Sequence, residues 1–231
     1  MKRKDFLKKG LAGAGGIVAL SAAIGFGKTK GEISPSAEAN CESSPKETRG
    51  PFPNKTPADY VRENIIGDRK GIALLINLKV VDQSKGCNPL GAALVDIWHC
   101  DNQGNYSEYG GYRMQETDLT REHFLRGRQS TDAKGEVSFI SIFPGYYPGR
   151  APHLHLEIFS ADKTSLLVTQ IAFPESICNT VYTTQNYQGT DYVKNTRDNV
   201  FGSSLKRNMA DSVSGNNSEG YILEKTIVVA S

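Results

Sequence analysis

The chain has 231 residues, 38% hydrophobic and 23% charged, which excludes a disordered polar chain and allows one domain with a buried core. The formal net charge is +2, but residues 1–39 hold seven of the 27 basic side chains and three of the 25 acidic ones, which leaves 20 basic and 22 acidic side chains in residues 40–231. We therefore expect no nucleic-acid partner, and no later stretch approaches the ~20 apolar residues of a membrane span.

Residues 1–39 are typical of an export signal. A basic region opens at Lys2, a Gly/Ala-rich apolar run follows, and Ala37-Glu38-Ala39 is a small-residue site for cleavage before Asn40. The basic start resembles a twin-arginine signal, with Arg3-Lys4 in place of two arginines. We expect an exported protein, periplasmic or extracellular. An uncleaved anchoring helix is one alternative; a lipid on Cys41 is another, less favoured because residues 38–40 make a poor lipobox.

Residues 40–70 are predicted to be a polar lead-in with several turn residues. Four cysteines follow the predicted signal: Cys41, Cys87, Cys100 and Cys178. In an oxidising compartment they allow two disulfides in three connectivities, and the sequence does not choose among them. Cys87 and Cys100 would pair poorly if an extended strand separates them. No C-x-x-C pair is present, so we do not expect a zinc site.

Residues 71–231 are predicted to form one all-β domain. Alternating apolar residues or short apolar runs predict strands at 72–81, 94–100, 136–143, 153–159, 166–173 and 221–229. Residues 107–121 are predicted to be a loop, and 176–220 a polar, turn-rich region with short helical turns. No long helical period interrupts these strands, so an antiparallel β-sandwich or barrel is expected, with the sandwich as first choice.

His153-Leu154-His155 lies inside one of these strands. Alternation sends the two imidazoles to the same face, roughly 7 Å apart, which suits chelation of one metal ion. Such a pair is weak evidence alone, since histidines often have structural roles. Its setting strengthens it, because a turn-dense loop just upstream carries Tyr146, Tyr147 and Arg150.

Five segments together resemble the intradiol ring-cleavage dioxygenases. VDIWHCDNQGNY at 95–106 is similar to the first iron-tyrosine segment of that family, and FLRGRQSTDAKG at 124–135 to the segment that follows. FPGYYPGRAPHLH at 143–155 resembles the second tyrosine, the arginine and the histidine pair, and TQIAFP at 169–174 the glutamine strand. ETRGPFP at 47–53 is similar to the opening motif, with Arg49 where an acidic residue is usual.

The resemblance implies a β-sandwich whose long loops carry one ferric iron per chain. Its ligands would be Tyr106, Tyr147, His153 and His155. Tyr147 is chosen over Tyr146 because it directly precedes Pro148. Tyr106 would stay bound while Tyr147 leaves when substrate arrives.

Arg150 and Gln170 would lie beside the bound ring. Two phenolates suit a hard trivalent iron, which would bind a catechol-type substrate and direct its reaction with O2 to a muconate-type diacid. Tyr147, Arg150 and Gln170 would be the catalytic residues.

Two other functions stay open at this stage. One is a non-catalytic exported β-sandwich that binds a carbohydrate or a protein ligand. The other is an iron(II) oxygenase with two histidines and a carboxylate such as Glu157, which leaves the tyrosine motifs unexplained. His99 and Trp98 are predicted to be packed, His123 to lie in a surface loop, and Asp101 to cap a turn. The substrate, the oligomeric state and the cleavage site are not determined by the sequence.

Overall fold

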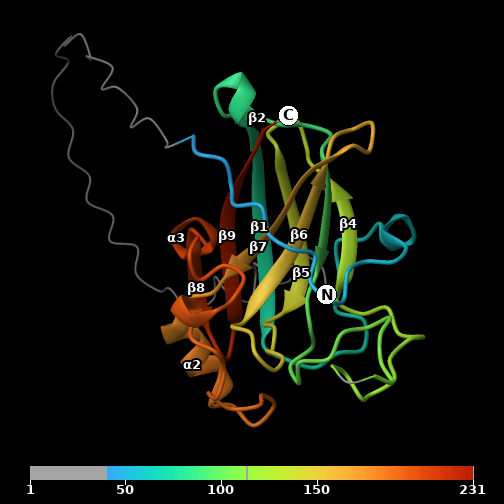
Figure 1. The fold of residues 1–231 in the computed structure, drawn as a ribbon, viewed down its shortest axis with the longest axis vertical. Helices are drawn as coiled ribbons and strands as arrows, with labels where there is room; N and C mark the ends of the chain where they lie inside the picture. The colour runs from blue at the N-terminus through green and yellow to red at the C-terminus, as the bar shows by residue number, and fades with distance from the viewer. Residues whose placement is uncertain (1–40, 113, 231) are drawn as a thin grey trace, which may run out of the picture.

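The computed structural model describes residues 41–112 and 114–230, so the predicted export signal lies outside the described residues. Nine strands form two sheets, which Figure 1 shows running along the long axis of the molecule. The first sheet contains β1 (Ala73–Asp82), β2 (Asn88–Pro89), β5 (Glu136–Ile142), β8 (Ser212–Asn216) and β9 (Gly220–Val229). The second has the order β4 (Arg126–Ser130), β3 (Leu94–Trp98), β6 (His153–Phe159), β7 (Ser165–Ala172).

The helical segments are short and lie outside the sheets. They are η1 (Pro57–Tyr60), η2 (Gln83–Lys85), α2 (Glu175–Tyr182), η3 (Asn195–Arg197) and α3 (Leu205–Asn208). In the described part of the chain no helix is both long enough and apolar enough to cross a bilayer. The helices α2 and α3 lie together with β8 on one side of the sheets (Figure 1).

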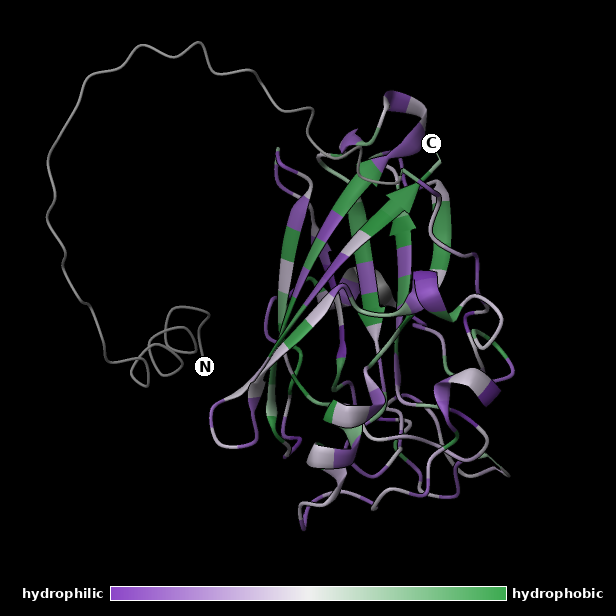
Figure 2. Ribbon diagram, turned by 90° about the vertical axis from the view of Figure 1, so that its left-hand side faces the viewer, coloured by the Kyte–Doolittle hydropathy of each residue, from purple (hydrophilic) through white to green (hydrophobic). Residues whose placement is uncertain are grey.

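The core fills the space between the two sheets. Alternating residues of β1 and β6, among them Leu74, Ile76, Leu154 and Leu156, are fully buried in one cluster. Figure 2 shows hydrophobic segments on the strands and hydrophilic ones in the loops at the lower end. The all-β sandwich expected from the sequence is therefore confirmed.

Two details of the sandwich differ from the expectation. The β1–β9 pair is parallel, whereas its neighbours are antiparallel. Strand β2, only two residues long, was not predicted. Strands β4 and β8 were not predicted either, because the sequences RGRQS and SVSGN lack alternating apolar residues. Both strands form through pairing with a neighbour rather than through their own pattern.

One disulfide is present in the described residues. Cys41 is bonded to Cys87 with a Cα–Cα distance of 5.8 Å, while Cys100 and Cys178 are buried free thiols. Of the two disulfides that four cysteines allow, only this one is formed. It joins the start of the lead-in to the turn that follows β1.

Candidate active site

A row of side chains crosses the outer face of the second sheet. Arg126, Trp98, His155 and Gln170 are register partners on β4, β3, β6 and β7. Because partners in register point the same way, these four side chains share the face that Leu154 and Leu156 leave free. The sequence alternation that buries the leucines therefore also brings His155 beside Trp98 and Gln170.

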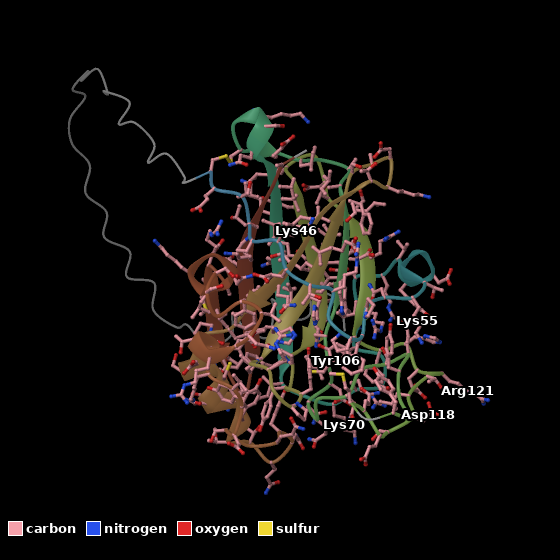
Figure 3. The ribbon with its side chains drawn as sticks, viewed as in Figure 1. Lys46, Lys55, Lys70, Tyr106, Asp118 and Arg121 are labelled. Carbon is pink, nitrogen blue, oxygen red and sulfur yellow. A yellow bond between two sulfur atoms is a disulfide. The ribbon has the colours of Figure 1, made fainter. Side chains whose placement is uncertain are left out.

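The four predicted ligands meet on this face. Ring centroids are 5.6 Å apart for Tyr106 and Tyr147, 5.6 Å for Tyr147 and His153, and 4.6 Å for the two histidines. Tyr106 also lies edge-on to His155 at 6.2 Å. All four residues are buried, with at most 4% of their surface exposed. Figure 3 labels Tyr106 in the lower part of the molecule, among the loops.

The two imidazoles are arranged as neutral donors of lone pairs. The Nδ1 of His153 donates to the Ala151 carbonyl at 2.6 Å, and its Nε2 lies 3.0 Å from the Nε2 of His155. Burial lowers the pKa of both histidines well below the ordinary value, and for His153 the positive charge of Arg150 adds to this effect. Two neutral Nε2 atoms that face one place are a ligand pair for a metal ion.

Tyr106 lies in an apolar part of the site. Phe52 stacks on its ring at 4.6 Å, and Trp98 and Cys100 belong to the same buried cluster. The hydroxyl of Tyr106 has no hydrogen-bond partner among the described residues, and burial raises its pKa well above the ordinary value. An unpartnered buried hydroxyl is costly unless something else satisfies its oxygen.

Tyr147 lies in a polar network centred on Arg150. The guanidinium donates to the Tyr147 hydroxyl at 3.0 Å, to Gln170 Oε1 at 2.6 Å and to Asp198 Oδ2 at 2.9 Å. Burial raises the pKa of Tyr147, but the positive charge of Arg150 and its hydrogen bond act in the opposite direction. The net pKa of Tyr147 is raised, so the network offsets only part of the effect of burial.

The donor set fits a ferric ion. No group of three or more His, Cys, Asp or Glu in the described ranges could hold a metal, so a metal here needs phenol ligands. The site offers four ligands, two phenols and two neutral imidazoles, from three separate segments. A metal would also give the Tyr106 hydroxyl oxygen a partner, which it lacks among the described residues. Anionic oxygen ligands favour a hard, trivalent ion.

Three residues of the site were not found from the sequence. Asp198 binds Arg150, Phe52 covers Tyr106, and Arg126 donates to the Phe52 carbonyl at 3.0 Å and to the Ser107 hydroxyl at 2.9 Å. Phe52 and Arg126 stood within segments of the family resemblance, whereas Asp198 lies in the polar region after it. No pattern in that region distinguishes Asp198 from its neighbours.

The remaining predictions about single residues are confirmed. His99 is buried and its Nε2 lies 2.7 Å from the Ser141 hydroxyl, and Asp101 accepts the backbone N–H groups of Gln103 and Asn105. Trp98 is buried as expected, but on the outer face of the second sheet, where it stacks on His155 with an interplanar angle of 2°. The side chain of His123 is 48% exposed.

Comparisons with known proteins identify the family. A family model described as "Dioxygenase" matches residues 49–212, which include every predicted ligand. The structure from Tetranychus urticae of an intradiol ring-cleavage dioxygenase is 30% identical, covers 82% of this chain and 95% of its own, and has a TM-score of 0.73. This chain belongs to the intradiol ring-cleavage dioxygenases.

The named relatives differ in the substrate that their names give. The protocatechuate 3,4-dioxygenase beta chain of Burkholderia cepacia is 31% identical over 137 residues, which is 55% of this chain and 54% of the relative. The chain thus spans about half the length of that relative. The structure of 3-chlorocatechol 1,2-dioxygenase from Rhodococcus opacus, 21% identical with a TM-score of 0.56, shares the fold over 84% of this chain and 75% of its own.

Proposed function

We propose that this chain cleaves the ring of a catechol-type substrate with O2, between the two hydroxyl-bearing carbons, to give a muconate-type dicarboxylic acid. The observation that carries the proposal is the convergence of Tyr106, Tyr147, His153 and His155 on one face of the second sheet. These residues would hold one ferric iron per chain. The names of the relatives, which act on protocatechuate or chlorocatechol, support a catechol-type ring without selecting one.

The iron would supply a Lewis acid that binds both catechol oxygens and withdraws charge from the ring. The residues around it divide the remaining work. Tyr147 has Arg150 as a second partner for its oxygen, so it can leave the metal and take a catechol proton without becoming an isolated buried charge. Tyr106 has no such partner, so it stays as a ligand.

Arg150 and Gln170 would act on the bound ring. Arg150 carries a permanent charge, and hydrogen bonds to Asp198 and Gln170 hold its guanidinium in place. It can therefore stabilise negative charge that develops on the substrate. Gln170 is itself held, since its Nε2 donates to the Thr48 carbonyl at 2.9 Å. Both side chains are therefore oriented before substrate arrives, which lowers the cost of reorganisation.

Iron-loaded protein tests this proposal directly. Phenolate ligands on ferric iron should give a wine-red colour, and a catechol panel in an oxygen electrode should show uptake with a dicarboxylic acid as product. His155→Ala should bleach the colour and stop the uptake. Colourless protein after refolding with iron, or extradiol products, would refute the proposal.

The two other readings are less well supported. A binding protein without catalysis gives no reason for two buried phenols beside two imidazoles. In the iron(II) reading Glu157 would be a ligand, but its carboxylate accepts hydrogen bonds from Arg49 and from the Ser165 hydroxyl. A carboxylate held in this way is not free to bind a metal.

We also propose that the protein is exported and works in an oxidising compartment. The disulfide between Cys41 and Cys87 supports this, because such bonds persist mainly outside the reducing cytosol. The same bond uses the thiol that a lipid on Cys41 would need. Cell fractionation with N-terminal sequencing of the mature protein tests both points; a cytosolic protein that begins at Met1 would contradict the proposal.

A further inference from the structure

Residues 41–54, which we name the strap, run along both sheets before reaching the site. The Ser44 N–H donates to the Val228 carbonyl on β9 at 2.9 Å, and the Glu47 N–H donates to the Val168 carbonyl on β7 at 2.8 Å. In Figure 1 the strap is the blue segment, and Figure 3 labels Lys46 on it above Tyr106. The strap therefore connects the first sheet to the second.

The far end of the strap covers two of the proposed ligands. Gly50 has φ +68°, and a Cβ at this position would lie 2.9 Å from Cε1 and 3.3 Å from Nε2 of His155. Two residues later Phe52 stacks on Tyr106. The Gly50 backbone thus lies against the Cε1–Nε2 edge of His155, and the Phe52 ring lies on the face of Tyr106. Movement of the strap would remove both contacts.

The near end of the strap is held by the disulfide together with hydrogen bonds: Gln83 Nε2 donates to the Cys41 carbonyl at 2.9 Å, and the Val228 N–H donates to the Ser44 hydroxyl at 3.0 Å. Cys41 is two residues from the predicted cleavage site, so in the mature protein the strap would begin almost at the chain terminus, where chains fray unless they are tied down. The ion pair of Glu42 with Arg207 is exposed, with side chains 55% and 44% accessible, and contributes little. The disulfide is the covalent attachment at this end.

We propose that Cys41 and Cys87 are positioning residues for the metal centre: their disulfide keeps the strap seated, so that Gly50 and Phe52 hold His155 and Tyr106 in place. The inference rests on the proposed function for the identity of the metal and on the proposed export for the position of the mature N-terminus. It makes the geometry of the site depend on a covalent bond formed in the compartment where the protein works.

Metal-free protein with Cys41→Ser and Cys87→Ser is the main test, with Glu42→Gln as matched control at the same end of the strap. Amide hydrogen exchange should speed up at Ser44 and Glu47 in the double variant while β6 stays protected. Emission of Trp98, the only tryptophan in the chain, should change because it stacks on His155. Cobalt(II), titrated by its visible absorption, should bind roughly tenfold more weakly. Glu42→Gln should match the wild type in all three.

Two further measurements cover a variant that fails to fold. Wild-type protein can be reduced by dithiothreitol, whose two thiols become its cyclic disulfide as Cys41 and Cys87 become thiols, and desalted before the same titration. Gly50→Ala leaves the disulfide intact and should weaken cobalt binding by displacing His155, without faster exchange at Ser44.

The outcomes distinguish a failure of the inference about the strap from a failure of the proposed function. Unchanged exchange at Ser44 and Glu47 after loss of the disulfide would overturn the inference, as would faster exchange with unchanged Trp98 emission and cobalt affinity. If the wild type bound no cobalt, the proposed function would be in difficulty, while exchange and Trp98 emission would still decide whether the strap positions His155.

Discussion

The hydroxyls of the two tyrosines of the site have different partners, although both rings belong to the same buried cluster. Tyr106 is enclosed by Phe52 and Trp98 and its hydroxyl lacks a described partner, whereas Tyr147 receives a hydrogen bond from a charged arginine. A metal would be the partner of the Tyr106 oxygen, whereas the Tyr147 oxygen can be bound either by a metal or by Arg150. The comparison teaches that two chemically identical ligands can be assigned different duties, one permanent and one displaceable, by their neighbours alone.

The largest expected effect comes from removing either hydroxyl in the iron-loaded protein. Tyr106→Phe should lose iron and colour, because the Tyr106 hydroxyl has no hydrogen-bond partner among the described residues that could hold a replacement water. Tyr147→Phe should bind iron more tightly than Tyr106→Phe does, by roughly tenfold or more, because Arg150 can hold a water in the place of the lost hydroxyl. Iron content after dialysis against a chelator measures the difference. Equal losses in the two variants would remove the proposed division of roles.

Arg150→Gln should come next in size. Removing the charge beside the substrate should lower kcat about 10²–10³-fold, as for the loss of a preorganised donor. Steady-state oxygen uptake at saturating catechol measures it, and Arg207→Gln on the surface serves as the control. A rise in KM with kcat unchanged would show that Arg150 assists binding rather than the developing charge.

In metal-free protein the order of the two tyrosine variants should reverse. Tyr106→Phe removes an unsatisfied buried hydroxyl and should leave the free energy of unfolding unchanged or raise it by about 1 kcal/mol. Tyr147→Phe breaks a hydrogen bond from a charged donor and should lower that free energy by about 2 kcal/mol. Urea unfolding of the apo variants gives both numbers. Destabilisation by Tyr106→Phe would mean that its hydroxyl has a partner even without a metal.

The smallest effect is expected at Asp198. Burial raises its pKa, but hydrogen bonds from Arg150 and the Ala151 N–H outweigh burial, so the net pKa is lowered. The carboxylate therefore stabilises the fold above the ordinary carboxyl pKa, and this contribution is lost as pH falls through the depressed value. Asp198→Asn should reduce kcat/KM about tenfold and flatten this acid-side loss of stability, measured by thermal unfolding at several pH values.

Asp211→Asn is the matched control for Asp198, since Asp211 pairs with Lys225 and is partly exposed. It should leave kcat/KM unchanged. Equal effects of the two substitutions would show that Asp198 acts through general stability and not by orienting Arg150.

Strand patterns and short motifs were enough to predict the sandwich and the four ligand candidates. The alternation in residues 153–159 settles which face carries His153 and His155, because a strand repeats every two residues. The polar strands β4 and β8 could not be found in this way, since their pairing depends on neighbours distant in the chain. The choice of Cys87 as the partner of Cys41 was likewise not available from spacing.

What the sequence by itself determined is the local part of this protein: the strand periods, the histidine pair on one face, and the motifs that carry two tyrosines, an arginine and a glutamine. Only the tertiary structure decided that Phe52 covers Tyr106, that Asp198 fixes Arg150, and that a disulfide ties down the strap. The reason is physical. Periodicity and turn preference act between near neighbours, whereas these contacts join residues about 50 positions apart, which meet only when the chain has folded.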